Sequence, residues 1–323
     1  MYLSIIVNVK MNRAKDVDHS KPKIGFIGCG NMGAPMCLRL VHAGYQVTAF
    51  DINEQSLKRV VDHGAHAAKS AAECAIGAEI FLTSLPRPDH VEAVMTGDNG
   101  ALASLKSGSI WVDLTTNRKE LIEAIAASAP IGVQVVDCPV TGAVDGARNG
   151  KLTLFIGGDL DSVAKVTPVL NHLGLVIHCG PRGTGNVVKL VTNQLWFIAA
   201  AALGEGFAIG IGNGVELGTL WHAIKESVGD SFVARHDAPS IFAGHYDPSF
   251  SLDLCMKDLN LIKELGSAVT ASLPMTDAAR NAFSLAKERY GANAAELHVV
   301  KRIEDDAKIS MRLDGDWTPP WEQ

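Results

Sequence analysis

Several features that mark other classes of protein are missing from this chain of 323 residues. The six cysteines include no C-x-x-C pair and no dense framework, which favours buried or free thiols in a reducing compartment over a disulfide scaffold. No dense run of Lys or Arg is present, and the net charge is -6, so nothing suggests binding to nucleic acid or to an anionic membrane. No internal repeat or low-complexity tract is evident.

No targeting segment is expected from the sequence either. The apolar patch at residues 2–7 has no preceding basic region and no cleavage pattern, so it is a poor signal peptide, and residues 1–22 predict a flexible extension. Residues 195–215 are apolar over nearly the length of a membrane span, but Glu205 and several glycines indicate a helix buried in protein. We therefore predict a soluble, cytoplasmic protein without a membrane partner.

The most informative segment is a G-x-G-x-x-G motif formed by Gly28, Gly30 and Gly33. It follows the apolar run 23–27 and precedes a helical pattern. The first glycine permits a tight turn, the second lets the backbone approach a pyrophosphate, and the third lets the helix pack on the strand. Free N–H groups at the helix start then face the anion. This context predicts a dinucleotide site rather than an ordinary glycine turn.

An acid closes the second apolar run of the same unit. Asp51 follows residues 47–50, where a carboxylate accepts hydrogen bonds from the ribose hydroxyls of NAD and repels the 2′-phosphate of NADP. No arginine follows within the next three residues, although Lys58 and Arg59 come one or two helical turns later. The sequence favours NAD, with NADP still possible; the alternative is that Asp51 only helps to cap the helix after Asn53.

Strands and helices alternate after this unit. Short buried strands are predicted at 79–85, 109–113, 133–137, 152–156 and 175–179, separated by helical patterns at 54–62, 89–95, 118–127 and 161–172. A capping box is predicted at Ser70 with Glu73, and Asn117 followed by Glu120 predicts a further helix start. The alternation predicts an α/β, doubly wound Rossmann-type domain over residues 23–183, with its ligand at the carboxyl ends of the strands.

Beyond residue 183 the strand pattern ends. Apolar residues recur at helical spacing, which predicts an all-helical C-terminal domain over residues 184–323. Its first helix is apolar nearly all round, so other helices must cover it, including those of a second subunit as one possibility. The tail from Asp314 is expected to pack on the surface.

Lys189 and Asn193 stand four residues apart, on one face of a predicted helix. A lysine among apolar neighbours loses part of its preference for the charged form, which brings it toward the range useful for proton transfer. The amide of Asn193 can orient the amine or a reacting hydroxyl. In isolation, a lysine that snorkels from a helix start is the better interpretation of this segment.

Two other segments are ambiguous by themselves. Residues 137–143 end in small residues and can bring backbone N–H groups and the Thr141 hydroxyl to a carboxylate, but an ordinary loop is the simpler interpretation. Lys257 and Asp258 are adjacent on a helical stretch and resemble a solvated pair.

Taken together, these motifs resemble the β-hydroxyacid dehydrogenase family, which includes 3-hydroxyisobutyrate dehydrogenase and tartronate semialdehyde reductase and is related to 6-phosphogluconate dehydrogenase. The resemblance covers residues 23–302 and rests on four segments in the family's order: 25–36, 137–150, 183–193 and 250–258. Two departures stand in the substrate segment. The family usually has serine where this chain has Thr141, and often glycine where it has Ala143.

The resemblance implies a role for each matching residue. Lys189 is the general acid/base and Asn193 its hydrogen-bonding companion; Thr141, Gly142 and Ala143 anchor the substrate, together with Lys257. The implied cofactor-binding residues are Gly28, Gly30, Asn31, Met32, Gly33, Asp51, Leu85, Pro86, Thr116 and Lys257. No metal is implied.

The implied reaction is hydride transfer between NAD(H) and a small carboxylate-bearing β-hydroxyacid or its semialdehyde, in a homodimer or homotetramer. Tartronate semialdehyde reductase, another semialdehyde reductase and a non-catalytic NAD-binding protein are the alternatives. A 6-phosphogluconate dehydrogenase is disfavoured by the short helical domain, and an imine reductase by Lys189. Trp196, Phe232, Arg235 and His236 are candidates for shaping the pocket, but spacing alone does not place them.

Overall fold

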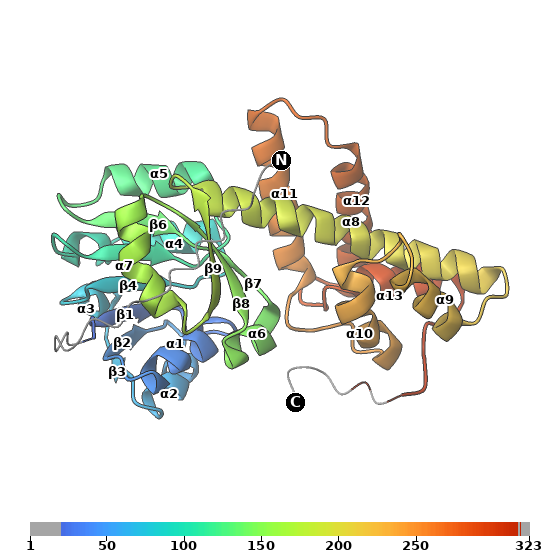
Figure 1. Cartoon of the computed structure of the whole chain (residues 1–323), viewed down its shortest axis with the longest axis horizontal. Helices are drawn as coiled ribbons and strands as arrows, with labels where there is room; N and C mark the ends of the chain where they lie inside the picture. The colour runs from blue at the N-terminus through green and yellow to red at the C-terminus, as the bar shows by residue number, and fades with distance from the viewer. Residues whose placement is uncertain (1–20, 316, 318–323) are drawn as a thin grey trace.

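A computed structural model describes residues 21–315 and 317 of the chain. They form an α/β part followed by a helical part, and the long helix α8 (Thr184–Gly212) runs from the first into the second (Figure 1). The predicted fold class is confirmed. Residues 1–20, and with them nearly all of the predicted extension, lie outside the described residues.

The α/β part is built on one sheet. Its strand order is β3-β2-β1-β4-β5-β6-β8-β7, with β9 paired to β8. The strands from β3 to β6 run parallel, whereas β8 is antiparallel to β6 and β7 and parallel to β9. The bounds are β1 (Ile24–Ile27), β2 (Val47–Phe50), β3 (His66–Ala67), β4 (Ile80–Thr83), β5 (Ile110–Asp113), β6 (Gln134–Asp137), β7 (Val140–Thr141), β8 (Leu152–Gly157) and β9 (Gly174–Gly180).

Helices cover both faces of this sheet, as a doubly wound fold requires (Figure 1). On one face lie α1 (Gly33–His42), α2 (Glu54–Val61) and α7 (Leu160–Leu170). On the other lie α3 (Ala71–Ala75), α4 (Pro88–Thr96), α5 (Lys119–Ala127) and the short 3-10 helix η1 (Leu102–Ser104). Because β1, β4 and β5 are buried on both faces, their sequences are continuous apolar runs.

Three features of the α/β part differ from the sequence prediction. The two-residue strands β3 and β7 are too short to give a periodic signal. The segment 137–143, for which an ordinary loop was the simpler interpretation, contains strand β7 and the first residue of helix α6 (Ala143–Asn149), a helix that the sequence analysis did not predict. Asn117 does not cap α5, because its side-chain oxygen accepts from the adjacent N–H of Arg118 and its amide donates to Asp113. The cap predicted at Ser70 is present, with its hydroxyl 3.1 Å from the Glu73 N–H.

The second part is helical. Around α8 stand α9 (Leu217–Lys225), the π-helix η2 (Val233–Asp237), α10 (Ala238–Ala243), α11 (Leu252–Ala268), α12 (Pro274–Tyr290) and α13 (His298–Ala307). At 29 residues, α8 is about 43 Å long at 1.5 Å per residue. Its inner face packs through Phe197, which meets Phe283 of α12 edge to face at a centroid distance of 5.1 Å.

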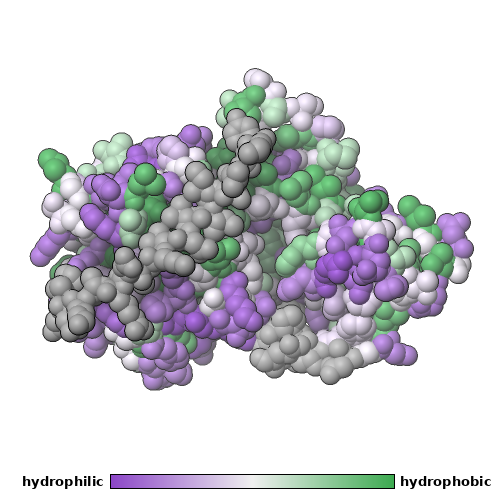
Figure 2. Space-filling model, viewed as in Figure 1, coloured by the Kyte–Doolittle hydropathy of each residue, from purple (hydrophilic) through white to green (hydrophobic). Residues whose placement is uncertain are grey.

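Only part of α8 is covered by helices of the same chain, so full burial of this helix in protein would need a second subunit. Leu195 is 64% exposed and Ile209 68%, and Glu205 is exposed between them. In the part of the chain that the structure describes, α8 is the one helix whose length and composition would suffice to cross a membrane, and 33% of its most apolar window is buried. On the face drawn in Figure 2, hydrophobic residues gather toward the region of α8, α11 and α12.

The remaining expectations concern thiols and the C-terminal tail. All six cysteines are described and free: Cys179 is partly exposed and the other five are buried. In the tail, Trp317 stacks edge-on against Trp221 at a centroid distance of 5.8 Å, so this residue packs on the helical part as predicted. The residues after Trp317 lie outside the described ones.

Candidate active site

The glycine motif forms the turn between β1 and α1. Gly28 has φ +93°, and a β-carbon there would collide with the carbonyl oxygen of Ser84. A β-carbon at Gly33 would collide with the carbonyl oxygen of Gly28, because the start of α1 packs directly on the turn. In contrast, a β-carbon at Gly30 would meet no atom within 4 Å. The two tight glycines shape the turn, and the space before Gly30 is free for a pyrophosphate, so the residues fit a dinucleotide.

Asp51 is fixed beside this turn. Its carboxylate accepts hydrogen bonds from the Cys29 N–H at 2.6 Å and from the Asn53 N–H at 2.7 Å. The helix that follows is capped by Asn53, whose side-chain oxygen accepts from the Ser56 N–H at 3.1 Å. The alternative in which Asp51 is only a helix cap is therefore wrong. Each carboxylate oxygen keeps a lone pair for a ribose hydroxyl.

The loops after β4 and β5 lie beside the glycine turn. A β-carbon at Gly28 would lie 3.2 Å from the side chain of Leu85, so this leucine packs beside the glycine turn. The Leu85 N–H donates to the Thr115 hydroxyl at 3.0 Å, which ties the two loops together. Pro86 is exposed and Thr116 is partly buried. The strand ends thus bring the cofactor residues predicted at 28–33, 51, 85–86 and 116 to one edge of the sheet.

Lys189 is buried where α8 leaves the sheet. The residue is 8% exposed, so the interpretation of a lysine that snorkels to solvent is wrong. Burial lowers the pKa of Lys189 to about 8; the nearby carboxylates of Asp258 and Glu296 act in the opposite direction, and the Lys257 ammonium adds to the lowering. At neutral pH both protonation states of this amine are therefore accessible, which suits a group that exchanges a proton.

A chain of polar contacts links this amine's helix to the cofactor loops. Asn193, one turn after Lys189, donates its amide to Asp258 at 2.7 Å. Asp258 pairs with Lys257 at 2.9 Å, and the two side chains are only 2% and 10% exposed. Lys257 Nζ in turn lies 3.5 Å from the carbonyl oxygen of Thr116. Lys257 and Asp258 are thus a buried bridge between the two parts, and the solvated-pair interpretation is wrong.

The start of α8 is anchored to the sheet by a buried acid that the sequence analysis did not single out. Asp137, at the end of β6, accepts from the N–H groups of Gly183 at 2.6 Å and Asn186 at 2.7 Å. The side chain of Asn186 also accepts from the Asn117 N–H at 2.6 Å. Because Lys189 lies about one turn after Asn186 on α8, these hydrogen bonds set the position of the amine relative to the sheet.

The predicted substrate segment follows β6. Thr141 is the last residue of β7 and pairs with Thr153 of β8. Gly142 has φ +120°, and Ala143 has φ +53°, a left-handed conformation in which glycine is usual. Thr141, Gly142 and Ala143 are all partly buried. The chain accepts an alanine in a strained position here, at a cost on the order of 1 kcal/mol.

The sequence analysis did not predict two features of the helical part: the contacts of Trp196 and His236 with Asp237, and the burial of Glu296. His236 Nδ1 lies 2.7 Å from one oxygen of Asp237, and the indole N–H of Trp196 donates to the other oxygen at 2.7 Å. Glu296 is 8% exposed, and burial raises the pKa of its carboxyl well above the usual value. No periodicity reports the contact of Trp196 with Asp237 or the burial of Glu296, because each depends on packing between segments far apart in the sequence.

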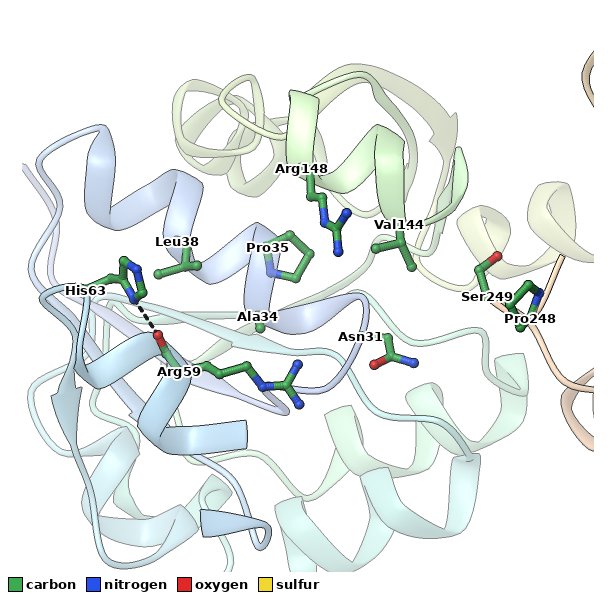
Figure 3. A pocket seen from close by; sticks show the side chains of 10 residues that line it. All are labelled: Asn31, Ala34, Pro35, Leu38, Arg59, His63, Val144, Arg148, Pro248 and Ser249. Atoms are coloured by element: carbon green, nitrogen blue, oxygen red, sulfur yellow. Dashed lines mark hydrogen bonds between the residues drawn. The ribbon is translucent and has the colours of Figure 1, made fainter. Parts of the chain in front are cut away.

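A cavity of about 380 Å³ opens beside the glycine turn, between α1, α2, α6 and the loop at Pro248 and Ser249 (Figure 3). The side chains of Arg59 and Arg148 project into it from two sides. Of the predicted site residues, only Asn31 lines it. The Lys189 cluster lies elsewhere, so this cavity neighbours the site and is not its centre.

Known proteins match both parts. Residues 23–180 match the family described as the NAD binding domain of 6-phosphogluconate dehydrogenase. Residues 183–303 match that described as the NAD-binding domain of NADP-dependent 3-hydroxyisobutyrate dehydrogenase. A 3-hydroxyisobutyrate dehydrogenase of Pseudomonas aeruginosa is 36% identical over 81% of this chain and 91% of its own length. The chain belongs to the β-hydroxyacid dehydrogenase family.

Other relatives of this dehydrogenase differ in the substrates they are named for. An NAD-dependent L-serine dehydrogenase of Pseudomonas aeruginosa is 32% identical over 88% of this chain and 98% of its own length. Among solved structures, a Mycobacterium tuberculosis 3-hydroxyisobutyrate dehydrogenase with L-serine matches with a TM-score of 0.81 at 27% identity, covering 87% of this chain and 99% of that one. The family match makes the protein an NAD(P)-dependent oxidoreductase that acts on a CH–OH group.

Proposed function

We propose that this dehydrogenase oxidises a small β-hydroxyacid to its semialdehyde, or runs the reverse reaction, in the manner of a 3-hydroxyisobutyrate dehydrogenase. The observation that carries the proposal is Lys189: a buried amine with a pKa lowered to about 8, at the junction of the sheet and the helical part. Relatives named for 3-hydroxyisobutyrate and L-serine support a carboxylate-bearing substrate with a hydroxyl on its β-carbon.

In the proposed reaction the neutral amine of Lys189 takes the proton of the substrate hydroxyl during oxidation, and the ammonium returns it during reduction. A nicotinamide cofactor held at the glycine turn would supply the hydride acceptor for oxidation of the hydroxyl-bearing carbon to a carbonyl, and the hydride donor for the reverse reaction. Asn193 holds the hydroxyl in line with Lys189, because its amide is itself fixed by Asp258 at 2.7 Å. The bonds from Asp137 keep α8 in place during the proton exchange.

The substrate carboxylate is assigned to the Thr141 hydroxyl, the backbone of Gly142 and Ala143, and Lys257. Thr141 keeps the hydroxyl that serine supplies in the family, and its extra methyl group narrows the space around the substrate. The Lys257 side chain is 10% exposed and already lies at the carbonyl of Thr116, so it can touch both substrate and cofactor. These contacts would fix the reacting end of the substrate beside the predicted nicotinamide-binding residues.

The proposed cofactor is NAD rather than NADP. The Asp51 carboxylate, held at 2.6 Å from the Cys29 N–H, would lie against a 2′-phosphate and repel it. The cofactor would be held by Gly28, Gly30, Asn31, Met32 and Gly33 at the pyrophosphate, and by Leu85, Pro86, Thr116 and Lys257 near the nicotinamide. We assign residues 23–183 to the dinucleotide-binding domain and residues 184–323 to the helical domain for substrate binding and oligomerisation.

A homodimer or homotetramer, formed through the uncovered face of α8, is the proposed assembly. Val191, Leu195 and Ile209 are 44%, 64% and 68% exposed and recur at spacings of one and four helical turns. A second subunit would remove this stripe from water. A soluble enzyme in the cytoplasm is the proposed location.

The proposal is tested by turnover of 3-hydroxyisobutyrate, L-serine and tartronate semialdehyde with NAD(H) and NADP(H), followed by NADH absorbance. We expect turnover with at least one β-hydroxyacid and a lower KM for NAD than for NADP. Tight NAD binding without turnover of any of these compounds would favour a non-catalytic NAD-binding protein instead. Light scattering of the purified chain measures the assembly, and a monomer at all concentrations would contradict it.

A further inference from the structure

Helix α11 carries three charged side chains along one stripe that contacts the α/β part. Asp253, Lys257 and Glu264 stand at positions i, i+4 and i+11, so their side chains leave the helix on one side. At 1.5 Å per residue this α11 stripe is about 16 Å long. The helix stands on the side of the helical part that faces the sheet (Figure 1). Each member of the stripe meets a residue of the α/β part.

The two acids of the α11 stripe pair with arginines at the ends of the cofactor loops. Arg87 Nη1 lies 3.4 Å from an oxygen of Asp253, and Arg118 Nε lies 3.4 Å from an oxygen of Glu264. Arg87 ends the loop after β4, and Arg118 ends the loop after β5. These are the two loops that carry the proposed nicotinamide-binding residues. The contact of Lys257 with the second loop, described above, lies between the two pairs along α11.

Local helix stability does not account for these two arginines. Arg87 and Arg118 are the N-cap residues of α4 and α5, and neither side chain caps its helix. The start of a helix carries the positive end of its dipole, so a cation there is unfavourable. The carboxylates of α11 bring a negative charge to both helix starts. The two positions therefore favour contact with α11 over the stability of their own helices.

The pair of Arg87 and Asp253 keeps other partners within each part of the molecule. One oxygen of Asp253 lies 2.7 Å from Lys287 Nζ of α12, and Arg87 Nε lies 3.2 Å from an oxygen of Asp89. Both charges therefore remain paired when the two parts separate. A contact that leaves no unpaired buried charge behind costs little to break. It is suited to form and break each time a cofactor binds and leaves.

The α11 stripe and the cofactor loops belong to two separately packed bodies. α11 is fixed in the core of the helical part through Leu259 and Ile262, which are 0% and 4% exposed. The two loops are tied to each other by the hydrogen bond from the Leu85 N–H to the Thr115 hydroxyl. Movement of the helical part away from the sheet thus breaks all three contacts of the α11 stripe together.

We propose that Asp253 and Glu264 are positioning residues for the cofactor: through Arg87 and Arg118 they hold the two nicotinamide loops against the helical part and slow the release of NADH. This inference rests on the proposed function, because it takes these loops as walls of the nicotinamide site. Neither acid is assigned a contact with the substrate or the nicotinamide, and both act through the arginines.

The test measures the rate constant of NADH release by stopped-flow fluorescence, with excess NAD as the competitor, and requires no substrate. The four side chains of the two pairs are 40% to 57% exposed, so each pair contributes modestly. Asp253→Asn and Glu264→Gln should each speed NADH release by about two- to fivefold, and the double variant by about five- to twentyfold. Raising NaCl from about 0.05 to 0.5 M screens exposed pairs and should bring the wild-type rate to within about twofold of the double variant's.

Asp277→Asn is the matched control. Asp277 pairs with Lys263 of α11 at 2.6 Å, and both residues belong to the helical part. The variant therefore removes the same charge and a comparable ion pair of α11 without a change in contact with the sheet, and its release rate should equal the wild-type rate.

A charge swap tests the pairing itself. Arg118→Glu and Glu264→Arg should each speed NADH release, because each places two like charges side by side. The two substitutions together restore an opposite-charge pair and should return the rate to within about twofold of the wild-type value. The swap uses this pair because Asp253 has a second partner in the helical part.

The outcomes separate the two proposals. Release from the double variant within about twofold of the Asp277→Asn rate, or a charge swap that releases NADH as fast as its single reversals, would overturn the role of the two acids and leave the dehydrogenase assignment intact. Absence of NADH binding by the wild type would overturn the proposed function, and this inference with it. Since Asp253 and Glu264 are tested separately, a folding defect in one variant does not remove the test.

Discussion

Replacement of Lys189 by methionine should abolish turnover and at the same time stabilise the fold. Methionine has a similar length and no charge, so it fills the same buried site. The pKa of Lys189 falls from 10.5 to about 8 on burial. That difference corresponds to about 3 kcal/mol by which the folded state disfavours the ammonium relative to the unfolded chain, at about 1.36 kcal/mol per pKa unit.

The sign follows from the direction of the pKa. Below the folded-state pKa of about 8 the charged amine is buried and the whole penalty is present; as the pH rises from 8 toward 10.5, the amine loses its proton in the folded state first, and the penalty disappears. Lys189→Met should therefore raise the free energy of unfolding by up to about 3 kcal/mol at pH 7. By pH 9.5 this gain should fall to less than roughly half.

The assay is urea unfolding of both proteins at pH 7 and pH 9.5, together with steady-state turnover. Lys165→Met is the control, because Lys165 is exposed on α7 and its replacement should give no pH-dependent difference. We expect kcat of Lys189→Met to fall by roughly 10² to 10⁴ while NADH binding is retained. A stability difference that does not vary with pH would refute the burial argument, and near-normal turnover would refute the role of Lys189 as acid and base.

Four further predictions concern the cofactor, the substrate and the pH dependence. Gly30→Ala should fold normally but bind NADH at least tenfold more weakly. Gly33→Ala should unfold at a lower temperature, because its β-carbon would collide with the carbonyl oxygen of Gly28. Calorimetry measures the unfolding temperature and NADH titration the affinity, and equal effects of the two variants on both quantities would contradict the geometry. Asp51→Ala should raise the KM for NAD more than that for NADP, measured at fixed substrate; an unchanged ratio of the two would argue against ribose binding. The kcat for hydroxyacid oxidation should rise with pH through about 8, because oxidation needs the neutral amine of Lys189. The kcat for reduction should fall over the same range, because reduction needs the ammonium form. Profiles of kcat against pH from about 6 to 10 that show no inflection near 8 would contradict this. Thr141→Val should raise the KM for the hydroxyacid by roughly tenfold with little change in NADH affinity, while Thr141→Ser should restore the wild-type value.

Local patterns were sufficient for much of this protein. The glycine turn and Asp51 are close in sequence, and their geometry depends on one β-α-β unit whose hydrophobic periods are clear. The position of Lys189 and Asn193 on one face of α8 follows from helical spacing alone. The change from strands to helices near residue 183 is visible as a change of period, so the order of the two fold types could be predicted without contacts.

Other features depended on contacts between distant segments. The burial and pKa of the Lys189 amine could not be predicted from its neighbours in sequence, because the same segment fits a lysine that reaches solvent. Burial by the packed helices lowers this pKa. Lys257 and Asp258 resemble an exposed pair until α11 packs against α8 and places Asn193 and Thr116 beside them. Burial and electrostatic interaction depend on the three-dimensional distance between groups, which sequence spacing fixes only within a single element.

The sequence by itself determined the order of elements, the dinucleotide turn and the residue types available for chemistry, because propensity, period and backbone sterics act over a few residues. Only the tertiary structure decided the charge state of the amine, the incomplete cover of α8 and the contact of Trp196 with Asp237. Each of those depends on desolvation and Coulomb interaction, which are set by side chains that come from different helices and strands.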